Sequence, residues 1–198
     1  AHAPTRDEAL DRLHAALAGL RIHGVTTNRE SLLAMVDDAD VRAGRTTIDL
    51  LERRADAFVP RPDERLLDTH AIVAAVAAQA QREQSRPSAG LSTAGWRSMG
   101  DAVDVFSFTG EGDRRVTLRS SRSGPPTARI DDGAEVLVTV HAWTSEHLDV
   151  EIDGIRRRAA VLVGEDRDDA DRTVHVFVDA HSSAWTEPAR LPAGDRTE

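Results

Sequence analysis

The stretch Leu66-Leu-Asp-Thr-His-Ala-Ile-Val-Ala-Ala-Val-Ala-Ala-Gln-Ala80 is unlike any other part of this chain. As a helix, residues 66–84 would carry apolar side chains on every face, and most of these are alanine. A helix that is apolar all round is a buried helix, and its alanines allow other elements to approach the backbone closely. The segment is too short and too closely flanked by charge to span a membrane. The sequence therefore predicts a helix enclosed by the rest of the fold.

Downstream of this helix, the apolar residues recur at every second position, which is typical of β-strands. Gly and Asp residues separate the strands, so the pattern predicts an antiparallel barrel or sandwich. A barrel wrapped around the helix at 66–84 accounts for both features. The predicted strands are marked by Val103 and Val105 with Phe106 and Phe108, Val116 and Leu118, Val136 to Val140, Leu148 to Ile152, Ala159 to Val163, and Val174 to Val178, with two further short candidates at 126–131 and 181–187.

Upstream of the apolar helix, the sequence predicts three amphipathic helices. The first spans residues 5–20 and begins with a capping-box pattern, Thr5 with Glu8. Asn28 is expected to cap the second helix, which carries Leu32, Leu33 and Val36. The third is expected at 48–54, after a second capping-box pattern of Thr46 with Asp49. Prolines and charges in the following residues, 56–65, indicate a boundary. The fold class expected is thus α+β.

The composition narrows the functions that this chain can have. The net charge of −9 makes nucleic acid a poor partner. The chain has no Cys, which rules out thiolate chemistry and suits a reducing, cytoplasmic compartment, and no membrane-spanning or signal segment is expected. All 25 basic residues are Arg, so the chain has no lysine to carry a cofactor or to bind a nucleotide phosphate.

No local motif predicts catalysis or a metal site. The acidic run at 164–171 fails as a calcium loop, because counting from Asp166 puts Phe177 where a bidentate Glu is needed. The eight His residues include no H-x-x-x-H or H-E-x-x-H pair, and His141, His147 and His175 are expected on strand faces. Ser92 is not in a G-x-S-x-G elbow, and the glycines near Gly110 lie between strands, where a dinucleotide loop does not occur. The classes of function that remain, once catalysis and metal binding lack a local motif, are binding and assembly.

The N-terminal segment resembles the end of a biotin carboxylase domain. The family pattern R-x-x-A-x-x-R-x-x-x-A-L, followed by G-[VI]-x-T-N and by a later Gly, Thr and Leu, is matched over roughly residues 1–58. The matching residues are Arg6, Ala9, Arg12, Ala16, Leu17, Gly24, Val25, Thr27, Asn28, Gly44, Thr47 and Leu51. The resemblance implies structural roles for Gly24, Thr27, Asn28 and Gly44.

The rest of the chain resembles the linker (BT) domain of acyl-CoA carboxylase alpha subunits of the propionyl-, methylcrotonyl- or acetyl-CoA type. In that family a long helix lies inside an antiparallel barrel, and the loop after the helix hooks onto the carboxyltransferase beta subunit. The resemblance therefore implies a partner interface at Leu91, Trp96, Arg97 and Met99. Trp96 is expected either to anchor that interface or to plug its own barrel. Arg97 is expected to pair with an acid across the interface or with Asp101.

The resemblance implies a segmental organisation. It assigns residues 1–58 to a truncated end of the carboxylase domain, 59–65 to a linker, 66–192 to the docking domain, and 193–198 to a linker toward a biotin carrier domain. The whole subunit would use ATP, Mg or Mn, and biotin to carboxylate biotin, in fatty-acid or branched-chain amino-acid metabolism. The ATP-grasp core and the carrier domain lie outside this segment, so no catalytic, cofactor or metal residue is expected here.

Two alternatives stay open from the sequence. The first is a stand-alone helix-in-barrel module that binds a small ligand or a peptide. The second is a small hydrolase, in which Ser92 would be essential.

Overall fold

The computed structural model describes residues 1–59, 62–84, 102–121, 124–165 and 171–189. The chain divides into two compact units, Ala1–Asp63 and Glu64–Glu198. Among the described residues, no helix is long and apolar enough to cross a membrane.

The first unit is helical, as the sequence predicts. Thr5 caps the first helix, since its hydroxyl accepts a hydrogen bond from the Glu8 amide at 3.3 Å. The elements are α1 (Arg6–Gly19), α2 (Arg29–Asp37), α3 (Ala39–Arg42), α4 (Leu50–Arg53) and the 3-10 helix η1 (Ala55–Phe58).

Three details of this unit differ from the expectations. Asn28 precedes α2, but its side chain makes no capping hydrogen bond. The predicted Thr46–Asp49 capping box is wrong, because α4 begins at Leu50 with Asp49 before it and no side-chain cap. The short helix α3 was not predicted; it is capped by Asp38, whose carboxylate accepts from the Asp40 and Val41 amides.

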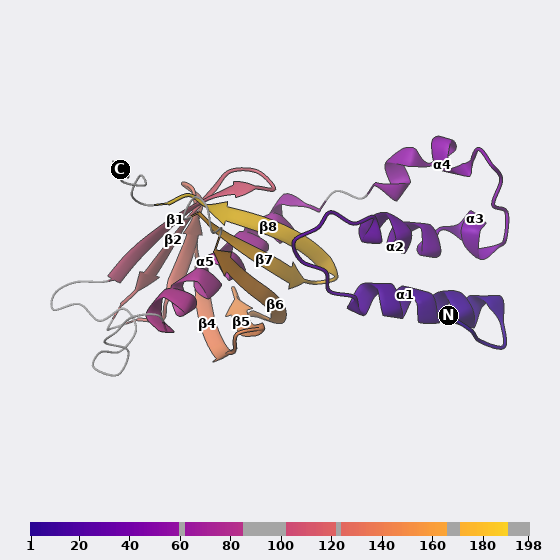
Figure 1. Ribbon diagram of the computed structural model, residues 1–198. Helices are drawn as coiled ribbons and strands as arrows, with labels where there is room; N and C mark the ends of the chain where they lie inside the picture. The colour runs from indigo at the N-terminus through magenta and orange to yellow at the C-terminus, as the bar shows by residue number, and fades with distance from the viewer. Residues whose placement is uncertain (60–61, 85–101, 122–123, 166–170, 190–198) are drawn as a thin grey trace, which may run out of the picture. The chain divides into compact units, whose positions relative to one another are not determined.

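The second unit begins with the apolar helix α5 (Glu64–Gln84), which is buried from Ala71 to Ala78. Eight antiparallel strands close around it in chain order (Figure 1). Both short candidate strands are present, and the predicted helix-in-barrel fold is confirmed. The strands are β1 (Ala102–Gly110), β2 (Arg114–Ser120), β3 (Thr127–Ile130), β4 (Glu135–Trp143), β5 (His147–Ile152), β6 (Ile155–Glu165), β7 (Arg172–Val178) and β8 (His181–Glu187).

The barrel closes where β1 meets β8. Thr109 pairs with Thr186, and Gly110 pairs with Trp185. Gly110 has φ +139°, and a Cβ at this position would collide with the Ala184 carbonyl oxygen. The seam therefore requires glycine at position 110.

The core lies between α5 and the inward faces of the strands. Phe106, Phe108 and Trp185 are almost fully buried there, with Phe108 stacked beside Phe106 and meeting Trp185 edge to face, each at 6.1 Å between ring centroids. On β1 the two phenylalanines face inward, while Val103 and Val105 face outward and are 39% and 45% exposed. His141, His147 and His175 lie on β4, β5 and β7, as expected.

Candidate functional site

The residues that the family resemblance assigns to a partner interface, Leu91, Trp96, Arg97 and Met99, lie outside the described residues. Ser92, on which the hydrolase alternative depends, also lies outside them. What the structure describes is the scaffold on either side of residues 85–101: α5, which ends at Gln84, and β1, which begins at Ala102.

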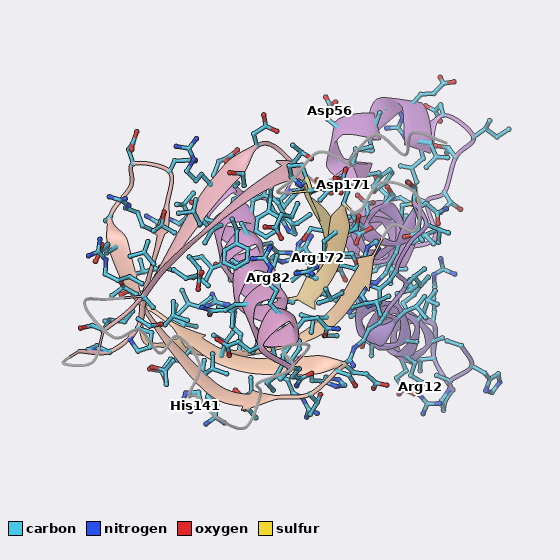
Figure 2. All side chains as sticks on the ribbon, turned by 60° about the vertical axis from the view of Figure 1, so that its left-hand side comes forward. Arg12, Asp56, Arg82, His141, Asp171 and Arg172 are labelled. Carbon is cyan, nitrogen blue, oxygen red and sulfur yellow. The ribbon has the colours of Figure 1, made fainter. Side chains whose placement is uncertain are left out.

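The C-terminal end of α5 is fixed to both strands of the barrel seam. Arg82 forms an ion pair with Glu187 of β8, and its guanidinium lies 4.7 Å from the ring centroid of Phe106 of β1. One turn earlier, the Gln79 amide donates to the Asp104 carboxylate at 2.9 Å. Figure 2 shows Arg82 on α5 within the ring of strands. Glu187 is only 5% exposed, so its charge depends on Arg82 for compensation.

The N-terminal end of α5 is fixed in a similar way to β2. Arg114 donates to the Asp68 carboxylate at 3.0 Å and forms an ion pair with Glu64. The Arg114 side chain is 14% exposed, while Glu64 and Asp68 are more accessible. Polar contacts therefore hold both ends of a helix whose middle is apolar.

Between these ends, His70 of α5 is buried against β8. Its Nδ1 lies 2.7 Å from the Ser183 hydroxyl, and the Trp185 indole donates to the same hydroxyl at 2.8 Å. Because an indole can only donate, the Ser183 hydrogen is available for a neutral His70. Burial lowers the pKa of His70 to about 4, and the positive charge of His181 acts in the same direction. His70 therefore serves as a neutral hydrogen-bond partner near neutral pH.

Sequence reasoning missed these inward polar residues of α5. Helix periodicity marks the segment as apolar all round, while His70, Gln79 and Arg82 find partners on strands far along the chain. The sequence signal that could have revealed them is the presence of polar side chains in a run otherwise made of alanine and branched residues.

The structure describes no constellation suited to a cofactor or metal. No group of three or more His, Asp or Glu side chains could hold a metal ion among the described residues. Asp171, from the acidic run, instead accepts a hydrogen bond from the Ala189 amide at 2.7 Å. Biotin is carried on a lysine, and this sequence has none. The sequence therefore has no lysine for biotin attachment, and the side chains in the described part of the chain do not fit a metal site.

A polar cleft of about 350 Å³ lies beside the β1–β2 hairpin. It is lined by Arg114 and Arg115 together with Asp113, Asp131 and Asp132. Arg114 is engaged with α5, and the Asp131 carboxylate accepts from the Arg115 amide at 3.0 Å. The guanidinium of Arg114 and the carboxylate of Asp131 are thus engaged within the fold.

Of the family-motif residues in the helical unit, Gly24 and Gly44 lie in turns and Thr27 lies just before α2, whereas the Asn28 side chain makes no capping hydrogen bond. Gly24 and Gly44 adopt φ values of +81° and +76°, where a side chain would be strained. The Thr27 hydroxyl accepts from the Arg29 amide at the start of α2. The motif therefore shapes the turns of this unit.

Arg29, which the sequence did not single out, joins the helices together. Its guanidinium donates to the carbonyls of Leu17 and Ala18 at 2.7 and 2.9 Å, at the end of α1. The last carbonyls of a helix lack amide partners one turn further on, and the Leu17 carbonyl also accepts from the Leu20 amide at 3.2 Å. Arg29 adds hydrogen bonds at this helix end and links α2 to α1.

Two family models match the chain. The model described as biotin carboxylase C-terminal domain matches residues 1–53. The model described as methylcrotonyl-CoA carboxylase, alpha-subunit, BT domain matches residues 68–190, well over half of the chain. The two matches fall on the helical unit and on the helix-in-barrel unit, respectively.

Proposed function

The chain belongs to the alpha subunits of biotin-dependent carboxylases, with a biotin carboxylase C-terminal domain followed by a BT domain, and we propose that its helix-in-barrel unit docks that subunit onto a carboxyltransferase beta subunit. The carboxylation of biotin with ATP and Mg or Mn would belong to the whole enzyme. The helix-in-barrel unit would contribute the assembly of the alpha subunit with the beta subunit.

The observation that carries this proposal is how α5 is held. Arg82 and Gln79 fix its last turns to β8 and β1, so the chain leaves the barrel at a defined place before residue 85. A loop that starts from a fixed point loses less conformational entropy on binding than a free one. This arrangement supports docking through the chain that follows α5, and within it we propose Leu91, Trp96, Arg97 and Met99 as contact residues from the family resemblance.

The interior of the barrel supports assembly over ligand binding. In a small barrel, a ligand would occupy the centre. Here α5 fills that place, and its residues from Ala71 to Ala78 are buried against the strands. The ligand-binding alternative therefore has no central cavity among the described residues, and assembly is the function that we propose. We also propose the cytoplasm as its compartment, which the lack of Cys supports.

Co-expression with the carboxyltransferase beta subunit tests the proposal. The tagged full chain should retain the beta subunit through size-exclusion chromatography. Trp96→Ala should weaken the complex at least about tenfold if Trp96 is an anchor residue, while Trp143→Phe, at a tryptophan on β4, should not. If the wild-type chain and the beta subunit elute separately at micromolar concentration, the docking role is wrong.

A further inference from the structure

The outer surface of the barrel has one wall without charge. The wall consists of outward-facing residues on four neighbouring strands, β6, β7, β8 and β1, and none of them is Asp, Glu or Arg. We call this surface the uncharged wall, and its residues, all within the described strands, are Leu162, Gly164, Thr173, His175, Ala184, Thr186, Thr109, Ser107, Val105 and Val103. The next row, Ala160, Phe177 and Ser182, is not included because Ala160 and Phe177 are buried.

Strand pairing makes the uncharged wall continuous. One row runs from Gly164 through Thr173 and Thr186 to Thr109, across all four strands. The Thr173 and Thr186 hydroxyls lie 3.2 Å apart, and the Thr109 hydroxyl donates to the Thr186 carbonyl at 3.4 Å. Some hydroxyls of this row thus form hydrogen bonds within the row. Excluding water from the surface therefore costs them fewer hydrogen bonds to solvent.

Apolar side chains project from both sides of this row. Leu162 on β6 is 47% exposed, and Val105 and Val103 on β1 are 45% and 39% exposed. Leu162 lies two residues before Gly164 on β6, and Val105 and Val103 lie four and six residues before Thr109 on β1. On its β2 side the wall borders Arg115 and Arg119, which pair with Ser107 and Val103, and its Ser107 and Thr109 also line the polar cleft beside the β1–β2 hairpin.

The opposite wall of the same barrel differs sharply. The outward positions of β2 to β5 and of the first half of β6 carry Arg115, Arg119, Arg129, Glu135, Asp149, Glu151, Arg156 and Arg158. Several of these pair with each other, as Arg156 does with Asp149 at 2.6 Å. In a chain of which 30% is charged, the lack of charge is therefore confined to one side of the barrel.

We propose that the uncharged wall is the barrel surface on which the carboxyltransferase beta subunit sits. This inference rests on the proposed function. It adds to that function the contact surface on the barrel, which is centred on Thr186 and flanked by Val105 and Leu162. The cores of protein–protein interfaces are depleted of charge in this way. An uncharged surface has no attraction for the phosphates of nucleic acid or of an anionic membrane.

Chain connectivity favours this occupant over another protein. Met99 lies four residues before Val103, so the two Cα atoms are at most about 14 Å apart whatever path the chain takes. A partner that contacts Met99 is therefore brought near Val103, at the β1 edge of the uncharged wall. Strand pairing closes the barrel at Thr109 and Thr186, so contact there is made by side chains.

The test places a charge on each wall and measures the affinity of the full chain for the beta subunit. Val105→Glu and Leu162→Glu change the uncharged wall. Leu137→Glu is the matched control, because Leu137 is 51% exposed on the outer face of β4, within the opposite wall that carries the charged residues. Leu162→Glu and Leu137→Glu make the same replacement at an exposed strand position, so for this pair the intrinsic strand preference changes alike. The thermal midpoint of each variant alone reports any loss of folding.

We expect Val105→Glu and Leu162→Glu to raise the Kd for the beta subunit at least about tenfold, and Leu137→Glu less than about threefold, with similar thermal midpoints. Wild-type binding that Trp96→Ala weakens but Val105→Glu and Leu162→Glu do not would overturn this inference alone. Failure of the wild-type chain to bind would overturn both the docking role and the assignment of the uncharged wall as the contact surface. If the wall variants instead abolish self-association in sedimentation, a second copy of the chain is the occupant and the proposal is wrong.

Discussion

Different interactions stabilise each of the two units of this chain. In the barrel unit, one continuous core joins α5 to all eight strands, and residues such as Phe106, Phe108 and Trp185 are fully or almost fully buried. In the helical unit, α1 has no buried residue, and the described buried apolar side chains are Val36, Leu50 and Phe58. Hydrophobic burial therefore dominates the stability of the barrel.

The helical unit depends more on hydrogen bonds from arginine to backbone. Besides Arg29, Arg6 donates to the carbonyls of Val41 and Arg42 and so ties α1 to α3. Val25, Ile48 and Leu51 are exposed in this unit. The two units of the chain therefore need separate stability arguments, and the barrel unit should be the more stable one.

Truncating a core aromatic should destabilise the barrel and leave the helices unchanged. Phe108→Ala removes a buried ring that contacts Phe106 and Trp185, and should lower the free energy of unfolding of the barrel by about 3–5 kcal/mol. Val103→Ala, at an outward position of the same strand, should cost less than about 1 kcal/mol. Hydrogen exchange read by mass spectrometry separates the two units. Equal effects at the two positions would contradict the assignment of the inward face of β1.

Acid should destabilise the barrel through His70. The pKa of His70 is about 4 in the fold and 6.5 when unfolded, so the unfolded chain binds more protons between these values. The contribution of His70 is intact above pH 6.5 and is lost as the pH falls toward 4, by up to about 3 kcal/mol. Chemical denaturation across this pH range measures the loss. His70→Gln should flatten the dependence, whereas His141→Gln, at an outward position of β4, should not, and an unchanged slope in His70→Gln would exclude His70 as the cause.

Removing the guanidinium of Arg29 should loosen the helical unit alone. Arg29→Met keeps an aliphatic side chain but loses the bonds to Leu17 and Ala18, and should cost about 1.5–3 kcal/mol. Arg53→Met, which breaks an exposed pair with Asp49, should cost no more than about 0.5 kcal/mol. Faster amide exchange in α1 and α2, with the barrel unchanged, is the expected result. A barrel that loosens equally would show that the units do not unfold independently.

The smallest effect concerns two hairpin turns of the barrel. Asp153-Gly154 and Asp179-Ala180 each form a two-residue turn with positive φ at both positions, and Ala180 has φ +63°. Alanine is strained there, so Ala180→Gly should stabilise the barrel by about 0.5 kcal/mol, and Gly154→Ala should destabilise it by about 1 kcal/mol. Thermal unfolding measures both. The same sign for the two substitutions would contradict this interpretation of the turns.

The sequence predicted the fold where the signal is local. The alanine-rich stretch from Ala71 to Ala78 indicated a buried helix, and alternating valines marked the strands, so the helix-in-barrel arrangement followed. Local patterns did not reveal which face of β1 is inward, because Val103 and Val105 alternate as regularly as Phe106 and Phe108. The larger rings fill the core around the small alanines of α5, and that choice depends on the partner helix.

The candidate site was less predictable than the fold. Arg82 meets Glu187, and His70 meets Ser183, across more than 100 residues of chain, and no local pattern encodes such pairs. The uncharged wall is also non-local, since it emerges only when the outward positions of four strands are compared around a closed barrel. The interface residues Leu91, Trp96, Arg97 and Met99 came from the family resemblance, and they stay a prediction.

Hydrogen exchange of the full chain, with and without the carboxyltransferase beta subunit, tests the docking role most directly. We expect added protection in peptides covering 85–101 and the neighbouring strands β1 and β8, with little change in residues 1–53. Protection confined to residues 1–53, or no protection at saturating beta subunit, would contradict the assignment of docking to the barrel unit.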